Sequence, residues 1–176
     1  YQRAVILKKA ADIIRANVEA YGKDTVMESG KPMAEAKGEW LVSANLFEWY
    51  AEECKRAYGK TIPAARNDKR MMTIWQPMGV VGVITAWNFP SYNPARAWAA
   101  ALAAGCTLVT KGSEFTALTT NNLVKALKEA GLPAGVLNNL VGEASSIGDE
   151  LLANAFVKKI SFTGSTRVGK ILMDGA

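Results

Sequence analysis

From residue 80 onward, short apolar runs alternate with longer segments that have a helical pattern. The apolar runs cover residues 80–85, 107–110, 136–141 and 159–162, and the helical segments cover residues 93–104, 118–130, 145–155 and 165–173. Strands that alternate with helices in this way are typical of a parallel sheet with helices on its faces. The pattern therefore predicts an α/β fold of the nucleotide-binding type over residues 80–176.

The chain ahead of this unit is predicted to be helical. Apolar residues recur at helical spacing through residues 5–18, and we expect Gly22 to end this first helix. A second helix is expected over about residues 32–58, because it begins with proline, a favourable first residue, and is followed by Gly59, a typical helix stop. Residues 1–58 are thus expected to add helices to the cofactor-binding unit.

An extended segment is predicted between the helices and the sheet. Residues 60–70 have no helical period and contain the turn-forming residues Asn67 and Asp68. Residues 71–76 then have a strand pattern with polar breaks, which suits an exposed edge or an arm that reaches a partner. We therefore expect an extended arm over residues 59–79.

Composition excludes several functional classes. The chain has no histidine, which excludes a Ser-His-Asp or Cys-His site and a histidine-bearing zinc site among these residues, and we expect no metal. The net charge of +5 is spread along the chain without a basic stripe, so no nucleic-acid partner is expected. The apolar stretch 97–109 is shorter than the roughly 20 residues of a membrane helix and contains Gly105, so no membrane partner is expected. Cys54 and Cys106 have no disulfide spacing and favour a reducing compartment such as the cytoplasm.

The sequence Trp-Asn-Phe-Pro at residues 87–90 follows the predicted strand 80–85 directly. The side-chain amide of Asn88 carries two N–H donors. Open α/β sheets bind their ligands at the carboxyl ends of their strands, and donors at this edge can stabilise a developing oxyanion. Asn88 is therefore the first candidate catalytic residue.

A cation and an anion stand three residues apart at the end of the predicted strand 107–110. Lys111 and Glu114 could hold the two hydroxyls of a ribose, one as donor and one as acceptor. A carboxylate at this point also repels a 2′-phosphate, which favours NAD over NADP. The alternative is a solvated loop in which Glu114 caps the helix that follows.

Two glycine-bearing turns join predicted strands to helices. Residues 162–166, Phe-Thr-Gly-Ser-Thr, open a helix, whose N-terminus attracts phosphate while Gly164 allows a ligand to approach closely. The alternative is an ordinary helix cap provided by Ser165 or Thr163. Residues 142–148 form the second turn, but the pattern lacks the middle glycine of a dinucleotide fingerprint and is weak evidence alone.

A P-loop is a further alternative. Residues 164–170 match G-x4-G-K between a strand and a helix, but Ile171 stands where a hydroxyl would hold Mg²⁺. The match also lies at the end of the chain with no acidic strand after it. A P-loop nucleotidase is therefore the least favoured interpretation.

Arg96 is the only charged residue in the predicted helix 93–104. Its guanidinium could extend along the helix to the surface, which is the commoner case, or point into a pocket and bind an anion. Cys106 stands among small apolar residues and is expected to be buried, and Cys54 is expected to belong to a helix face, so neither is expected to be a nucleophile.

Taken together, the motifs resemble those of the aldehyde dehydrogenase superfamily, and specifically its succinate-semialdehyde dehydrogenase branch. The resemblance spans almost the whole chain, and its segments are residues 76–82, 87–90, 101–107, 111–114, 129–136 and 162–166. The resemblance implies a Rossmann-like parallel sheet over residues 80–176, preceded by the helices and by an oligomerisation arm. It also implies a homodimer or homotetramer.

The resemblance assigns roles to individual residues. Asn88 is similar to the oxyanion-binding asparagine of the family, and Arg96 to the carboxylate-binding arginine of the semialdehyde branch. The remaining matches are cofactor-binding positions, Asn88 among them: Thr85 and Trp87 beside the nicotinamide, Lys111 and Glu114 at the adenosine ribose, Gly164 and Ser165 at the pyrophosphate, and Val168 near the adenine. Ser113 and Gly148 are also expected to bind the cofactor.

The activity implied is oxidation of a small anionic aldehyde, such as a semialdehyde, to its acid with NAD, or with NADP. In the family, the catalytic glutamate and the cysteine nucleophile lie downstream of the Phe-Thr-Gly-Ser-Thr motif, at positions beyond Ala176. This chain alone is therefore expected not to catalyse the oxidation. A dinucleotide-binding module without catalysis is the alternative. Gly112 and Ala86 replace prolines of the family pattern, which leaves the choice between NAD and NADP open.

Overall fold

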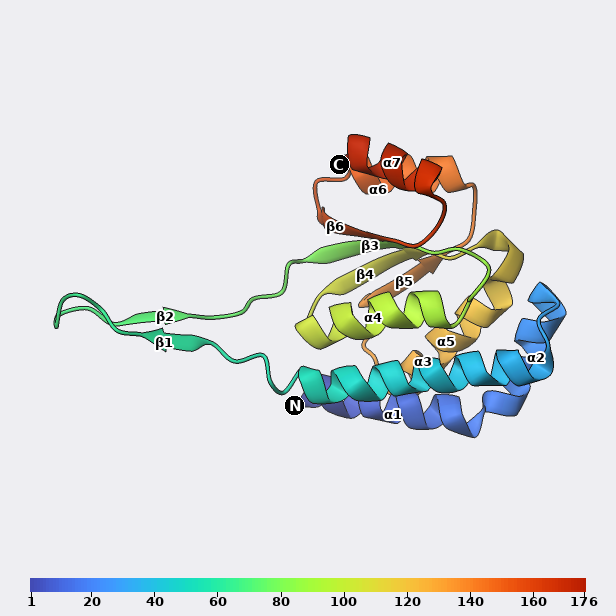
Figure 1. Ribbon diagram of the computed structural model, residues 1–176, viewed down its shortest axis with the longest axis horizontal. Helices are drawn as coiled ribbons and strands as arrows, with labels where there is room; N and C mark the ends of the chain where they lie inside the picture. The colour runs from blue at the N-terminus through green and yellow to red at the C-terminus, as the bar shows by residue number, and fades with distance from the viewer.

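The computed structural model describes all residues from 1 to 176, and it consists of a helical layer, a projecting arm and an α/β sheet (Figure 1). The helical layer comprises α1 (Gln2–Ala16), α2 (Val18–Ser29) and α3 (Met33–Glu53), and the arm comprises β1 (Lys60–Ile62) and β2 (Met71–Thr73). The remaining elements alternate: β3 (Val80–Ile84), α4 (Tyr92–Ala104), β4 (Thr107–Lys111), the one-turn helix η1 (Glu114–Thr116), α5 (Ala117–Glu129), β5 (Leu137–Leu140), α6 (Ala144–Ala153), β6 (Val157–Phe162) and α7 (Thr166–Asp174).

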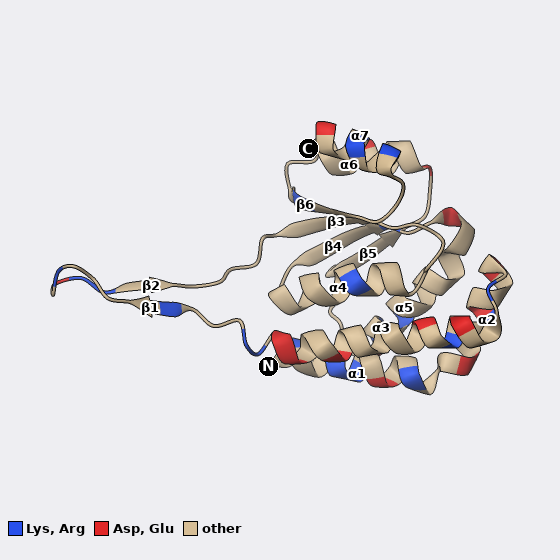
Figure 2. Ribbon diagram, viewed as in Figure 1, with Lys and Arg blue, Asp and Glu red and all other residues tan.

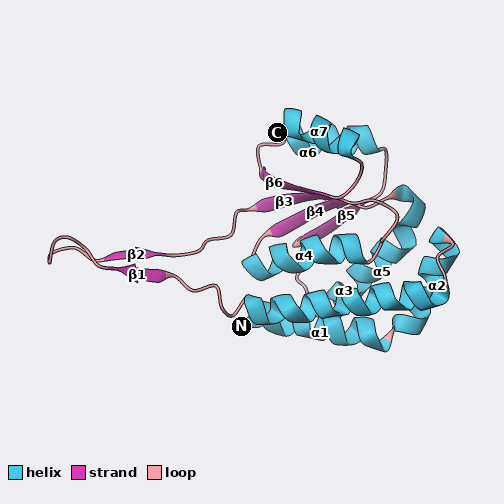
Figure 3. Cartoon of the chain, in the orientation of Figure 1, coloured by secondary structure: helices cyan, strands magenta, loops and turns pink.

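The predicted α/β fold is confirmed, because the four strands after the arm form one parallel sheet in the order β5-β4-β3-β6. Helices α4 and α5 cover one face together with the N-terminal helices, and α6 and α7 cover the other (Figures 1 and 3). The predicted bounds of these strands and helices fall within two residues of the observed ones.

The central strand β3 is apolar on both faces because both are covered. Packing explains why glycine occupies position 82, in the middle of this strand. A Cβ at this position would lie 2.8 Å from the Ile160 side chain and 3.3 Å from that of Leu151. The missing side chain lets α6 and β6 pack tightly against β3, as close-packed interiors require. On the opposite face Val81 and Val83 enter the main core.

That core lies between the sheet and the N-terminal helices. Trp40 and Phe47 of α3 and Trp98 of α4 are all fully buried in it, against small residues such as Ala10 and Ala99. Alanines let the helix backbones approach closely while the aromatic rings fill the space between them. The N-terminal helices therefore belong to the same core as the sheet.

The predicted end of the first helix is wrong. The break comes at Asn17, and a second helix, α2, runs through Gly22 and ends at Gly30, whose φ of 68° is left-handed. Gly22 is buried, and a Cβ there would lie 3.2 Å from the side chains of Met33 and Lys37. Gly22 therefore serves the close packing of α2 on α3, while Gly30 provides the stop.

The predicted end of the second helix is also wrong, because α3 stops at Glu53 and residues 54–59 are not helical. Gly59 is not a helix stop: a Cβ there would lie 2.1 Å from the Thr73 carbonyl oxygen. It is needed where the two sides of the arm come together.

The arm is a two-stranded antiparallel ribbon that projects away from the body (Figures 1 and 2). Lys60 pairs with Thr73, and Ile62 pairs with Met71. The expected strand 71–76 is therefore shorter than predicted, and its partner β1 lies at the start of the segment 60–70, for which an extended arm was expected but no strand bounds. Strand β2 carries no charged residue and β1 carries Lys60, while the other charged residues of the arm lie towards its tip (Figure 2).

Candidate functional site

The carboxyl ends of three neighbouring strands bring the predicted site residues to one edge of the sheet. Ile84 of β3 lies opposite Lys111 of β4 and Phe162 of β6. The Thr85 N–H donates to the Lys111 carbonyl oxygen at 3.1 Å, and the Thr163 N–H donates to the Ile84 carbonyl oxygen at 2.9 Å. The turns after β3, β4 and β6 therefore start side by side, at the edge where open α/β sheets bind their ligands.

Asn88 lies in the turn between β3 and α4 and is exposed, as are its neighbours Trp87 and Phe89. The Asn88 Oδ1 atom accepts a hydrogen bond from Asn93 Nδ2 at 3.3 Å. Because the carbonyl end of the amide is engaged, the amide nitrogen of Asn88 is the end that can donate to a ligand. Asn93 is buried in the first turn of α4, so the contact sets the orientation of the Asn88 amide.

Two further residues, neither of them predicted from the sequence as a site residue, hold this turn. Glu39 Oε1 accepts hydrogen bonds from the Ser91 N–H at 2.7 Å and the Tyr92 N–H at 3.0 Å. Lys31 Nζ donates to the Asn88 carbonyl oxygen at 2.9 Å. A signal for Glu39 was present, because a carboxylate stands among Ala36, Trp40 and Ser43 on the buried side of a predicted helix.

At the end of β4, Lys111 and Glu114 contact each other. Lys111 Nζ lies 2.5 Å from Glu114 Oε2, and the Lys111 side chain is buried while that of Glu114 is 46% exposed. The hydrogen bond from Lys111 lowers the pKa of Glu114 below its usual value, so this carboxylate is ionised at neutral pH. The pair can present one donor and one acceptor to a diol.

The alternative role of Glu114 as a helix cap is wrong. Ser113 Oγ caps η1 by accepting from the Phe115 N–H at 3.3 Å. The carboxylate of Glu28, from α2, accepts from the N–H groups of Leu118 and Thr119 at the start of α5. Glu114 is therefore free of these capping roles and faces solvent beside Lys111.

The helix α6 carries its own anion at its N-terminus. Glu143 accepts from the N–H groups of Ser145 at 3.0 Å and Ser146 at 2.6 Å, and from Ser145 Oγ. These hydrogen bonds lower the pKa of Glu143 to about 2. One turn later Gly148 is buried, yet a Cβ there would meet nothing within 4 Å. The glycine therefore lines an opening beside α6, and not a phosphate-binding turn.

The turn after β6 leads directly into α7. Ser165 Oγ accepts from the Val168 N–H at 3.3 Å, so Ser165 caps the helix as the alternative interpretation predicted. A Cβ at Gly164 would lie 2.5 Å from the Phe162 ring. Close packing against this ring therefore explains why the position holds glycine. Gly169 and Lys170 lie inside α7, which starts at Thr166, so residues 164–170 do not form a phosphate-wrapping loop and the P-loop interpretation is wrong.

Arg96 points along α4 towards the turn after β6. Its side chain is exposed, and its Nη2 atom donates to Thr163 Oγ1 at 2.8 Å. The guanidinium also lies 5.7 Å from the centre of the Tyr92 ring. Arg96 is thus at the surface, but it is held next to the same strand edge as Asn88 and Ser165.

Comparison with known proteins identifies the fold family. The sequence profile described as "Aldehyde dehydrogenase family" matches residues 1–176. The chain belongs to the aldehyde dehydrogenase family. It is 46% identical to a mitochondrial succinate-semialdehyde dehydrogenase of Arabidopsis thaliana over 99% of this chain and 33% of the relative. It is 44% identical to an NADP⁺ succinate-semialdehyde dehydrogenase of Escherichia coli strain K12, over 98% of this chain and 36% of the relative.

The solved structures agree. An aldehyde dehydrogenase from Brucella melitensis biovar abortus matches with a TM-score of 0.96 and 49% identity, over 98% of this chain and 36% of that chain. The chain thus spans about a third of the length of the aldehyde dehydrogenases that it matches. No helix combines the length and the hydrophobicity that are needed to span a membrane.

Proposed function

We propose that this chain is the cofactor-binding part of a longer NAD(P)-dependent aldehyde dehydrogenase that oxidises a small anionic semialdehyde to the carboxylic acid. The observation that carries the proposal is Asn88, whose side chain is exposed and engaged only through its Oδ1 atom, at the same strand edge as the Lys111–Glu114 pair and the start of α7. The names of the succinate-semialdehyde relatives support the substrate class.

The residues at this edge fit a dinucleotide. Lys111, Ser113 and Glu114 would hold the adenosine ribose, and the Gly148 opening with the half-buried Val168 would accept the adenine. Gly164 and Ser165, at the N-terminus of α7, would face the pyrophosphate. Thr85 and Trp87 would lie beside the nicotinamide, which when bound as NAD(P)⁺ supplies the hydride acceptor.

Asn88 would act on the aldehyde. Its N–H donors would stabilise the oxyanion that forms when a thiolate attacks the carbonyl carbon, and a fixed donor needs no reorganisation at that moment. Neither cysteine of this chain can supply that thiolate at this edge. Cys106 is buried just before β4, at the opposite edge of the sheet, and Cys54 follows the end of α3. We therefore place the nucleophile in the rest of the proposed enzyme.

Activity of the complete protein tests the proposal directly. We expect reduction of NAD(P)⁺ with succinate semialdehyde, and loss of about 100-fold or more in kcat for Asn88→Ala. Cofactor binding without any aldehyde oxidation by the complete protein would favour the alternative, a non-catalytic dinucleotide-binding module. Absence of both would reject the cofactor site as well.

Arg96 is proposed to bind the carboxylate of the semialdehyde. Its guanidinium is exposed, and its hydrogen bond to Thr163 already directs it towards the strand edge. We expect Arg96→Ala to raise KM for succinate semialdehyde about tenfold or more, the loss of a charge-assisted contact. KM for an uncharged aldehyde of similar length is the control and should stay unchanged, whereas equal effects on both aldehydes would reject the role.

NAD is proposed as the better cofactor. Glu114 is ionised and exposed beside Lys111, and its charge would repel a 2′-phosphate. The E. coli relative is named as an NADP⁺ enzyme, so the cofactor preference has to be decided by measuring Kd for NAD and for NADP. We expect a lower Kd for NAD than for NADP, and a smaller difference in Glu114→Gln. Tighter NADP binding by the unaltered protein would reject this preference.

The arm over residues 59–79 is proposed to build a homodimer or homotetramer. It exposes Met72, Ile74 and Trp75 to solvent, and exposed apolar side chains along an extended arm suit a protein interface. The mass of the complete protein in solution, with and without the arm, tests this. We further propose the cytoplasm as the compartment, which the free thiols Cys54 and Cys106 support.

A further inference from the structure

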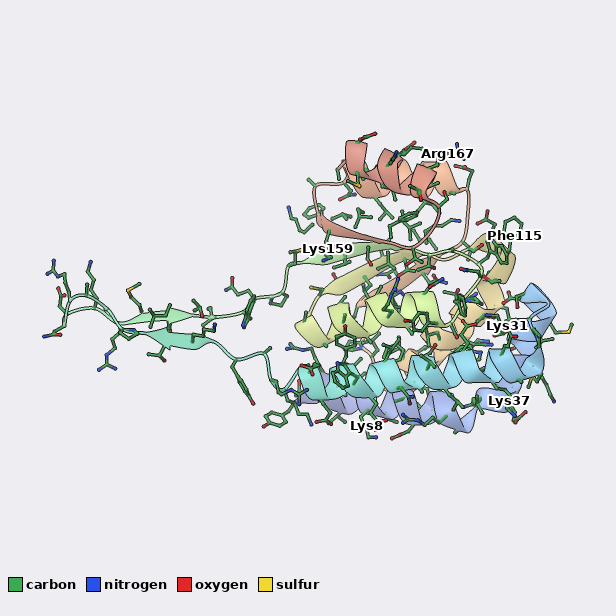
Figure 4. The ribbon with its side chains drawn as sticks, in the orientation of Figure 1. Lys8, Lys31, Lys37, Phe115, Lys159 and Arg167 are labelled. Atoms are coloured by element: carbon green, nitrogen blue, oxygen red, sulfur yellow. The ribbon has the colours of Figure 1, made fainter.

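A buried ion pair lies beneath the turn that carries Asn88. Lys31 Nζ lies 2.5 Å from Glu39 Oε2, and the two side chains are 11% and 2% exposed. Lys31 stands in the short link before α3, at the end of that helix nearest to the start of α4 (Figure 4). Burying two charges is unfavourable unless the geometry is good and further hydrogen bonds satisfy them, and an apolar pair often stabilises a fold equally well. Stability alone therefore gives no reason for this pair.

Both charges are engaged with the turn. The second oxygen of Glu39 accepts three hydrogen bonds, from the Ser91 N–H, from Ser91 Oγ at 2.8 Å and from the Tyr92 N–H. It therefore caps α4 from a different helix. Lys31 donates to the Asn88 carbonyl oxygen, and its ammonium lies 4.2 Å from the centre of the Phe89 ring. The pair thus holds the backbone on both sides of Pro90.

We propose that Lys31 and Glu39 are positioning residues for Asn88, an inference that rests on the proposed oxyanion role of that side chain. Asn93 orients the Asn88 amide, but it cannot fix where the backbone places that amide. Lys31 holds the Asn88 carbonyl itself, and Glu39 holds the first turn of α4 on which Asn93 lies. Misplacing a donor by about 1 Å can reduce a rate by about 100-fold.

The test is a double-mutant cycle in the complete protein. Glu39→Gln and Lys31→Met are each expected to lower kcat for semialdehyde oxidation by about 100-fold while Kd for NAD stays unchanged. In an Asn88→Ala background, neither change should lower kcat further, because the group that they position is gone. Lys31→Arg, which keeps the charge, should retain most of the activity.

Lys37→Met is the matched control. Lys37 pairs with Glu19 of α2, so this is also an ion pair made by a residue of α3, but it lies at the surface. The variant should have unchanged kcat. An effect of Glu39→Gln that is as large in the Asn88→Ala background as in the unaltered protein would overturn the proposal, and so would unchanged kcat in both Glu39→Gln and Lys31→Met.

A crystal structure of the complete Lys31→Met protein separates this inference from the proposed function. The introduced thioether side chain would still cover the Phe89 ring, so the fold should be kept, but residues 87–90 should move by about 1 Å relative to β3. An unmoved turn would overturn the positioning role whatever the activity. If the unaltered protein oxidises no aldehyde, the proposed function fails, and the displacement of the turn still decides whether Lys31 holds it.

Discussion

The arm depends on the absence of one side chain, which predicts a large local effect of Gly59→Ala. A Cβ at residue 59 would lie 2.1 Å from the Thr73 carbonyl oxygen and 3.2 Å from its carbon, whereas real contacts of this kind stay above 3.0 Å. Both neighbours are backbone atoms, so the arm must open by about 0.9 Å or more beside the Lys60–Thr73 pair. A hydrogen bond of about 2.9 Å would then reach about 3.8 Å, beyond a bonding distance.

This opening is expected to separate the ribbon. The ladder has three residue pairs, each hydrogen bond contributes a net ~1 kcal/mol, and an isolated two-stranded ribbon is marginal. Loss of the Lys60–Thr73 pair is therefore expected to separate the other two residue pairs of the ribbon as well. Amide hydrogen exchange in the complete protein should rise at residues 60–62 and 71–73 while α1 and α3 stay protected, and the proposed oligomer should dissociate more readily.

Gly38→Ala is the control for this prediction. A Cβ at Gly38 meets nothing within 4 Å, and the residue lies inside α3, so alanine should stabilise the helix by up to about 1 kcal/mol. Arm exchange should be unchanged in this variant. Protected arm amides in Gly59→Ala, together with an unchanged oligomer, would refute the steric argument.

Three further predictions concern the body. Trp98→Ala should lower the free energy of unfolding by about 3–5 kcal/mol. Trp98→Phe should lower it by less, because the buried indole N–H that this variant removes has no hydrogen-bond partner. Urea unfolding measures both changes. Gly148→Leu should fill the opening beside α6 and raise Kd for NAD at least about tenfold, which cofactor titration measures. Calorimetry should show no loss of thermal stability. Glu143 has a pKa lowered from 4.5 to about 2, so its capping contribution is complete above pH 4.5 and is lost as the pH falls towards 2. The stability difference between the unaltered protein and Glu143→Gln should therefore shrink over that interval, and a constant difference would contradict the cap.

The order of elements could be predicted because it depends on local patterns. Runs of apolar residues and the helical period fix the strands and helices after residue 80 to within two residues of their observed bounds. The contact between Lys111 and Glu114 could also be expected, because residues three apart after a strand can meet in one turn. These features need only near neighbours in sequence.

Glycine is ambiguous without the tertiary structure. Gly22 and Gly59 were both expected to end helices, yet each allows a close approach by a distant segment, α3 in one case and Thr73 in the other. Gly30, which does end a helix, has open space where its Cβ would be and a left-handed φ instead. The same residue type thus serves backbone freedom in one place and packing in another, and only the neighbour distinguishes them.

Glu39 was missed for a related reason, since its partners Ser91 and Tyr92 lie more than fifty residues away. A buried carboxylate on an otherwise apolar helix face requires distant donors, so its presence alone predicts a polar contact but not where the contact lies. The structure places that contact at the start of α4, directly after the turn that carries Asn88. Because Lys31 and Glu39 hold the two ends of this turn, a change at either residue should alter the position of Asn88 before it alters the stability of the sheet, whose strands neither residue joins.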